Sequence, residues 1–87
     1  MNTYPTVDAH TYAPAPFAAE KARAENSADA EELDTLAFHP SPYVRIRVAG
    51  NTSTSATTLR RLMADPEADV FFAAALNPSA PEIGEPS

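Results

Sequence analysis

The sequence predicts an all-α fold, built from short helices that repeat along the chain. Two observations carry this prediction. The chain matches itself when it is shifted by 26 residues, with the same residue types in the same order. Within each matching unit, leucine and valine recur at helical spacing, and turn-forming residues follow them.

Seven identities support the repeat in this one register. They pair Leu33, Leu36, Pro40, Val44, Ala49, Asn51 and Ser53 with Leu59, Leu62, Pro66, Val70, Ala75, Asn77 and Ser79. Leucine, valine and asparagine carry the match, so an alanine-rich composition does not by itself explain it. Residues 24–26 form an earlier Ala-x-Asn element, which indicates a degenerate unit before the two clear ones, or about two and a half units in all.

The sequence predicts five helices, near residues 17–25, 29–37, 42–49, 55–64 and 67–76. In the first clear unit, Asp29 and Glu32 have the spacing of a capping box, which opens the helix that bears the first leucine pair. Ser41 and Pro42 supply an N-cap and a first-turn proline for the partner helix, and Gly50 marks its end.

The second clear unit has the same order of signals. Its Ser/Thr-rich lead-in, residues 52–58, offers N-cap candidates for the first helix. Asp65 is the expected N-cap of the second helix, with Pro66 at the first helical position, where no N–H is needed. Asn77 is expected to end that helix in the left-handed conformation, and Pro78 cannot continue it. Ala37, Ala49, Ala64 and Ala75 are the small residues expected where helices cross.

With these joints placed, the sequence resembles a bacterial family of helical repeats, the leucine-rich repeat variant. The resemblance covers about residues 22–83 and rests on two Leu-x-x-Leu pairs with Val44-Arg45, Asp65-Pro66 and Asn77-Pro78-x-x-Pro81. It implies that each unit pairs an α-helix with a shorter α- or 3₁₀-helix, and that the units stack into a short right-handed α-solenoid. Members of the family serve mainly as parts of larger proteins, and membership implies no common catalysis.

Three regions follow from this organisation. Residues 1–16 contain three prolines and no helical or strand periodicity, so a disordered arm is expected there. Its tyrosines and prolines are either a linear motif for another domain or simply a tail. Residues 17–83 are the expected repeat domain, and residues 84–87 a flexible tail.

Composition limits the classes of function. The absence of cysteine excludes disulfides and thiolate metal sites and favours a reducing, cytoplasmic setting. The sequence lacks an uninterrupted apolar run of the roughly 20 residues that cross a membrane, so no membrane partner is expected. His10 and His39 lack partners at metal-binding or catalytic spacing, and two glycines do not make a phosphate loop. We therefore expect neither enzyme activity nor a metal or cofactor.

Charge is distributed in three blocks. Residues 35–64 carry four arginines and no acidic residue, whereas both flanks are acidic and the net charge is −6. The acidic balance argues against nucleic acid as the main partner. The basic block consists of Arg45, Arg47, Arg60 and Arg61.

Two sets of residues are candidates for a binding face. By the repeat register, Arg45 lies on the shorter helix of one unit and Arg60 and Arg61 on the longer helix of the next, on one side of the stack. These arginines either bind an acidic partner or pair with the acidic flanks, at Glu31, Asp34, Asp65 or Asp69.

The second set is Phe71 and Phe72. Adjacent helical residues rarely both face a core, so one ring is expected to be partly exposed and to form an interface. The alternative is that Phe71 or Phe72 packs under the C-terminal tail through Ile83. The open end of the repeat also leaves a homodimer open as an interpretation.

These observations predict a non-catalytic protein–protein interaction module. Its partner is expected to be another protein with an acidic or apolar surface, bound by Arg45, Arg47, Arg60, Arg61, Phe71 and Phe72. The alternatives are a nucleic-acid-associated regulator that uses the same arginines, and a structural dimer that assembles through the open repeat end.

Overall fold

A computed structural model describes residues 16–81 of the protein. Five α-helices make up this part of the chain, without a strand: α2 (Ala18–Asn26), α3 (Ala30–Leu36), α4 (Pro42–Gly50), α5 (Ala56–Leu62) and α6 (Ala68–Ala75). The all-α prediction is confirmed for these residues, and each helix begins and ends within two residues of its expected range. The predicted arm, apart from Pro16, lies outside the described residues, as do the tail and Ile83.

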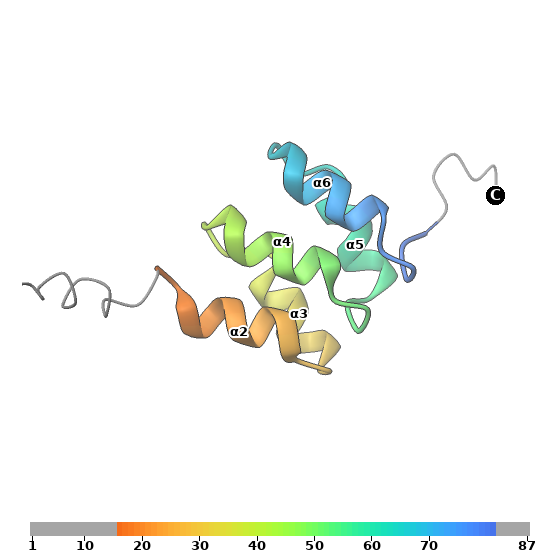
Figure 1. Ribbon diagram of the computed structural model, residues 1–87. Helices are drawn as coiled ribbons and strands as arrows, with labels where there is room; N and C mark the ends of the chain where they lie inside the picture. The colour runs from red at the N-terminus through yellow and green to blue at the C-terminus, as the bar shows by residue number, and fades with distance from the viewer. Residues whose placement is uncertain (1–15, 82–87) are drawn as a thin grey trace, which may run out of the picture.

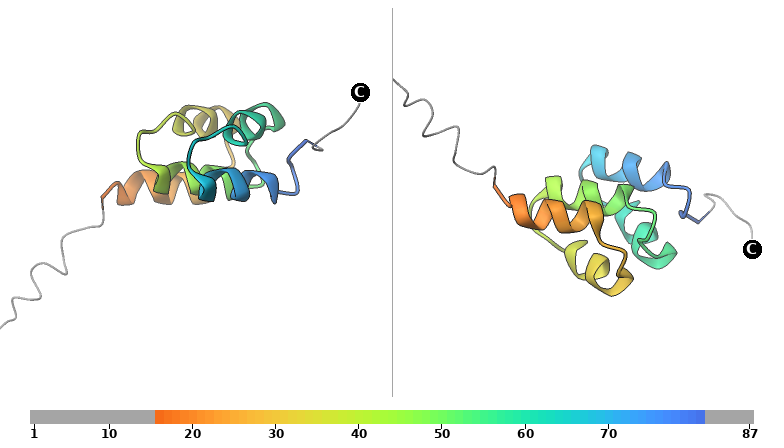
Figure 2. Two further views of the ribbon diagram at one scale, coloured as in Figure 1. Left: turned by 90° about the horizontal axis from the view of Figure 1, so that it is seen from above. Right: turned by 60° about the horizontal axis from the view of Figure 1, so that its bottom comes forward.

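The helices form two layers (Figure 1). Helices α2, α4 and α6 lie side by side in the first layer, and α3 and α5 form the second layer against it (Figure 2, left). Helix α4 is the central member, because it packs against both α2 and α6.

The two layers differ in helix length, and this corrects one prediction. Helices α3 and α5 have seven residues each, whereas α4 has nine and α6 has eight. Arg45 therefore lies on the longer helix of its unit, and Arg60 and Arg61 lie on a shorter one. Helices α3 and α5 end at the second leucine of their pairs, and Pro40 and Pro66 prevent them from continuing much further, because the residue before a proline avoids the α-helical region.

The predicted leucine and valine faces form the core. The core contains Ala24, Leu33, Leu36, Ala37, Val44, Val48, Ala49, Leu59, Leu62, Val70 and Ala74. Each leucine buried in this way contributes roughly 1.5–3 kcal/mol. The expectation of small residues at crossings holds for Ala37 and Ala49, which are buried, but Ala64 is exposed and Ala75 half-buried.

The structure confirms some of the predicted helix starts and corrects others. Ser41 caps α4 by accepting a hydrogen bond from Tyr43 N, with Pro42 at the first position, as predicted. Asp29 caps α3, but its capping box with Glu32 is wrong: Glu32 Oε1 accepts a 2.7 Å hydrogen bond from Ser27 Oγ. Ser27 Oγ in turn accepts one from Asp29 N, so the hydroxyl takes the place of the carboxylate.

Asp65 is not the N-cap of α6, contrary to the prediction. The helix starts at Ala68, with Glu67 at the N-cap position. Asp65 Oδ1 accepts a hydrogen bond from Glu67 N and so shapes the turn that leads into the helix. The same carboxylate also accepts hydrogen bonds from the Arg45 guanidinium.

Asn51 and Asn77 join neighbouring helices of the first layer. Asn51 Nδ2 donates to the carbonyl oxygens of Ala24 at 2.9 Å and Ser27 at 2.8 Å. Asn77 Nδ2 donates to those of Ala49 at 2.8 Å and Asn51 at 2.9 Å. We call these contacts the asparagine bridges. They satisfy carbonyls at the C-terminal ends of α2 and α4 that have no partner within their own helices.

The bridges correct the expected role of Asn77, which was a left-handed helix end. Among residues 16–81 the left-handed conformation occurs at one non-glycine position, Phe17, and not at either asparagine. Asn51 Oδ1 and Asn77 Oδ1 each accept from the backbone N–H two residues later. Ser27 Oγ does the same, so Ser27, rather than Asn26, is the counterpart of Asn51 at the end of α2.

Candidate protein-binding site

Arg45 is committed to contacts within the protein. Its guanidinium makes a two-pronged ion pair with Asp65, with Nε at 2.7 Å from Oδ2 and Nη2 at 3.2 Å from Oδ1. Nη1 donates to the carbonyl oxygens of His39 and Pro40. The side chains of Arg45 and Asp65 are 14% and 8% exposed. Arg45 therefore ties the link before α4 to the link before α6 and presents little surface to a partner.

The other arginines do not meet Arg45 on one face. Arg47 Nε lies 3.7 Å from a carboxylate oxygen of Glu25, on the α2 side of α4. Arg61 donates a 2.9 Å hydrogen bond to Asp34 Oδ1 in α3. Arg60 is exposed and forms no ion pair within residues 16–81. The alternative prediction, pairing with acidic residues, is confirmed at Asp34 and Asp65.

The Asp34 carboxylate shows the electrostatic effect of this pairing. The hydrogen bond from Arg61 and a second one from the Thr58 hydroxyl hold the pKa of the Asp34 carboxyl below its ordinary value. The Arg61 guanidinium also lies 4.4 Å from the centroid of the Phe38 ring. Because both charged side chains are about half exposed, solvent screens most of the pair's energy.

Phe71 and Phe72 occupy α6, at one edge of the first layer. The Phe72 side chain is 56% exposed and Phe71 is half-buried, with their ring centroids 5.0 Å apart. The prediction that one ring is exposed is confirmed, and Phe72 is that ring. Leu76, four residues later on the same helix side, is 81% exposed and extends this apolar surface.

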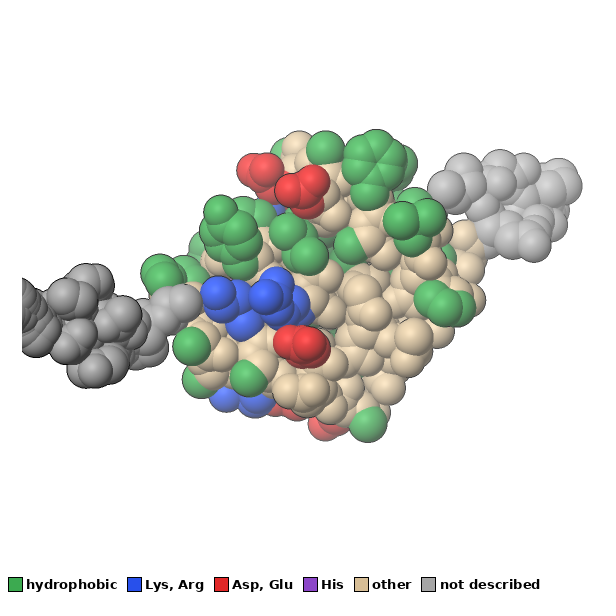
Figure 3. Space-filling view, in the orientation of Figure 1, with side chains coloured by type: hydrophobic (Ala, Val, Ile, Leu, Met, Phe, Trp, Pro, Cys, Tyr) green, Lys and Arg blue, Asp and Glu red, His purple; other side chains and the backbone are tan. Residues whose placement is uncertain are grey.

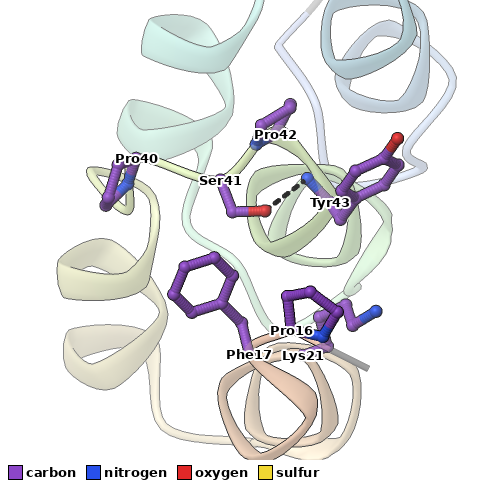
Figure 4. Close-up of a pocket in the computed structure, with 7 residues that line it drawn as sticks. All are labelled: Pro16, Phe17, Lys21, Pro40, Ser41, Pro42 and Tyr43. Carbon is purple, nitrogen blue, oxygen red and sulfur yellow. Dashed lines mark hydrogen bonds between the residues drawn. The ribbon is translucent and has the colours of Figure 1, made fainter. Parts of the chain in front are cut away.

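A groove that the sequence analysis missed lies between the N-terminal ends of α2 and α4 (Figure 4). Its volume is about 410 Å³, and its lining is Pro16, Phe17, Lys21, Pro40, Ser41, Pro42 and Tyr43. Tyr43 is 63% exposed and Phe17 44% exposed. In Figure 3, hydrophobic side chains lie around these helix ends, with basic side chains beside them, and a separate hydrophobic group lies toward one end of α6, with acidic side chains at the other end.

The walls of the groove are held in place by local contacts. Phe17 has a left-handed backbone, with φ at 60°, and its ring stands edge-on against His39 with centroids 4.6 Å apart. Ser41 Oγ is used as the cap of α4, since it accepts from Tyr43 N. Lys21 Nζ lies 5.8 Å from the Tyr43 ring centroid, at the position of a weak cation–π contact. The groove is thus apolar, with one cationic group beside it.

At this end of the junction between α2 and α4, the described residues form no ion pair. Lys21 is the fourth residue of α2, as Arg45 is of α4. His39 Nδ1 accepts from Ser41 N just as Asp65 Oδ1 accepts from Glu67 N. Where α4 meets α6, these positions hold the Arg45 guanidinium and the Asp65 carboxylate. Where α2 meets α4, the corresponding positions hold the Lys21 ammonium and the His39 imidazole. These two groups do not form an ion pair, and no side-chain hydrogen bond between described residues spans this end.

The described part of the chain shows neither a metal-binding cluster nor a helix of membrane-spanning character. Residues 16–81 bring together no group of three or more His, Asp or Glu side chains that would hold a metal ion. In the same residues, none of the helices has both the length and the apolar character needed to cross a bilayer.

Comparison of the chain with protein-family models, curated proteins and solved structures finds no match. The resemblance to the leucine-rich repeat variant therefore rests on the sequence motifs alone. The groove, too, has to be interpreted from its own chemistry.

Proposed function

We propose that this protein is a non-catalytic protein-binding module, and that it binds an extended, apolar segment of its partner in the groove between α2 and α4. The observation that carries this proposal is the exposure of Phe17 and Tyr43 around a hollow whose other walls are largely proline. Grooves lined by aromatic rings are a recurring means of binding proline-rich peptides, because such peptides are already extended.

The chemistry of the groove favours a peptide over a small charged ligand. Tyrosine offers a large contact area and loses little side-chain entropy on binding. Lys21 provides a positive charge beside the apolar walls, so a partner with an acidic group next to its apolar residues fits best. This is the acidic or apolar partner that the sequence predicts, bound at a different place.

We also propose that the helices are units of a short right-handed α-solenoid of the leucine-rich repeat variant type, in the cytoplasm. The 26-residue register, the side-by-side order of α2, α4 and α6 and the recurring asparagine bridges support the repeat. The absence of cysteine supports the location. In such an arrangement each unit buries its apolar face on the next.

Selection from a library of random dodecapeptides tests the proposed function on the full chain. We expect enrichment of peptides with proline and an aromatic residue, and about tenfold weaker binding of these peptides to Tyr43→Ala. The control is Phe38→Ala, which removes an equally exposed ring that does not line the groove. Equal loss of affinity in both variants, or none in either, contradicts the proposal.

A second candidate function is self-association through α6. The exposed Phe72 and Leu76 favour it, since they place two large apolar side chains on one helix side. We expect sedimentation analysis to show a mass that rises with concentration, and Phe72→Ala to remain monomeric. A monomer at all concentrations excludes this candidate. The nucleic-acid alternative has less support, because Arg45, Arg47 and Arg61 each lie beside a carboxylate.

A further inference from the structure

We infer that the groove is occupied by the chain's own stretch Tyr4–Asp8, with Tyr4 and Pro5 against the apolar walls and the Asp8 carboxylate at Lys21. This stretch lies outside the described residues. The inference rests on the proposed function, because the same groove would hold either the partner's segment or Tyr4–Asp8. A partner would therefore have to compete with this stretch of the chain for the groove.

The groove itself defines the chemistry of its occupant. Its walls are two aromatic rings and three prolines, and they require apolar or aromatic side chains on an extended backbone. Lys21 forms no ion pair with a carboxylate of residues 16–81. At the junction of α4 with α6, the fourth residue of α4, Arg45, faces the Asp65 carboxylate. Lys21, the fourth residue of α2, faces no such carboxylate among the described residues, and this is the group that an occupant of the groove would supply.

The stretch Tyr4–Asp8 supplies both requirements. It reads Tyr-Pro-Thr-Val-Asp, so an aromatic residue and a proline come first and a carboxylate ends it. Asp8 is the one acidic residue among residues 1–15, and that segment contains no lysine or arginine. Proline keeps the backbone extended before binding, which reduces the entropy lost on docking.

The length of chain permits this contact. Pro16 lines the groove, so the segment begins at the rim of its own binding site. Seven residues, 9–15, separate Asp8 from Pro16 and span at most roughly 23–25 Å when extended. Lys21 lies in the first turns of α2, roughly 6 Å along the helix axis from Phe17. The tether is therefore long enough to turn back, and short enough to give a millimolar effective concentration.

Paramagnetic relaxation in the full chain tests the inference. Because the sequence contains no cysteine, Asn2→Cys accepts a single nitroxide label. We expect the label to broaden the amide signals of Lys21 and Tyr43 and to leave those of α5 sharp. Adding either Tyr43→Ala or Asp8→Asn is expected to remove most of this broadening. Adding Phe38→Ala, the matched exposed ring, is expected to leave it unchanged.

A mixture of unlabelled ¹⁵N chain with nitroxide-labelled ¹⁴N chain separates the sources of the segment. Docking within one chain produces no broadening in this mixture. Broadening that appears there with equal strength assigns the groove to the segment of a second copy and overturns the inference. Equal broadening in the parent chain, Tyr43→Ala and Asp8→Asn also overturns it, since a freely moving segment gives that result. In either case, library peptides that still require Tyr43 leave the proposed function standing.

Discussion

The first layer contains two junctions that share a backbone design and differ in side chains. At their C-terminal ends, α2 with α4 and α4 with α6 are joined by the same contact, an asparagine bridge from Asn51 or Asn77. At their N-terminal ends, α4 and α6 are connected through the ion pair of Arg45 with Asp65, whereas α2 and α4 are separated by the groove. The difference shows that a groove lies at the N-terminal end where the described residues form no ion pair, while the asparagine bridges at the opposite ends stay the same.

The largest expected effect comes from breaking the closed junction, the one between α4 and α6 that the Arg45–Asp65 ion pair connects. Arg45→Ala leaves the shielded Asp65 carboxylate without its partner and should lower the free energy of unfolding by about 3 kcal/mol. Lys21→Ala changes the matching position of the open junction, the one between α2 and α4 where the groove lies. This variant should lower the free energy of unfolding by less than about 1 kcal/mol. Urea denaturation of both variants measures the contrast. Similar losses would show that the two junctions do not differ as described.

The asparagine bridges provide the next largest effect. Asn77→Ala leaves the carbonyl oxygens of Ala49 and Asn51 without this donor and should cost about 2 kcal/mol. The matched control is Asn26→Ala, because the exposed Asn26 amide binds only a carbonyl of its own helix. Its cost should stay within about 0.5 kcal/mol. Denaturant midpoints compare the two, and an equal shift would deny the bridges a role in stability.

Installing the missing pair should have a smaller, opposite effect. The double variant Lys21→Arg with His39→Asp recreates the guanidinium and carboxylate of the closed junction. We expect it to be about 1 kcal/mol more stable than the sum of the single variants predicts. A double-mutant cycle measured by denaturation gives this coupling. A coupling near zero would mean that the backbone at the first junction does not bring these positions together.

The smallest expected effect concerns the exposed ion pair between Asp34 of α3 and Arg61 of α5, in the second layer. Because the folded state lowers the pKa of Asp34, the stabilisation is complete above the unfolded value of about 4 and is lost as pH falls through the lower folded value. Asp34→Asn should therefore reduce the loss of stability on acidification in this window by a small amount. Denaturation at pH 2 to 5 checks the sign, and a steeper loss in the variant would refute it.

Local signals in the sequence explain why the helices were predicted well. The leucine pair at Leu59 and Leu62, and the prolines that precede α4 and α6, act within a few residues of the structure they determine. The bridging role of Asn77 was not predictable in this way, since its acceptor Ala49 lies 28 residues earlier. An asparagine near a helix end fits a left-handed cap equally well until the neighbouring helix is in place.

The candidate site likewise depends on contacts between residues that lie far apart in the sequence. The sequence offers Asp65 as one of four possible acidic partners of the arginines, but only the packing of α4 with α6 shows that it pairs with Arg45, 20 residues earlier. The groove combines Phe17 with Tyr43 from two helix starts, and neither residue has a distinctive spacing. The 26-residue register pairs His39 with Asp65, but it pairs Lys21 with Arg47. Lys21 and Arg45 correspond as the fourth residues of α2 and α4, 24 residues apart, so the N-terminal end at which the described residues form no ion pair is identified only once the helices are placed.

The binding of a library-selected peptide to the double variant Lys21→Arg with His39→Asp tests the central claim most directly. If the groove is the binding site and is open because this pair is missing, the variant should remain folded and bind the peptide at least about tenfold more weakly than the parent chain. Isothermal titration measures the affinity, and helical circular dichroism confirms the fold. Unchanged affinity in a folded variant that shows the expected gain in stability would contradict the claim.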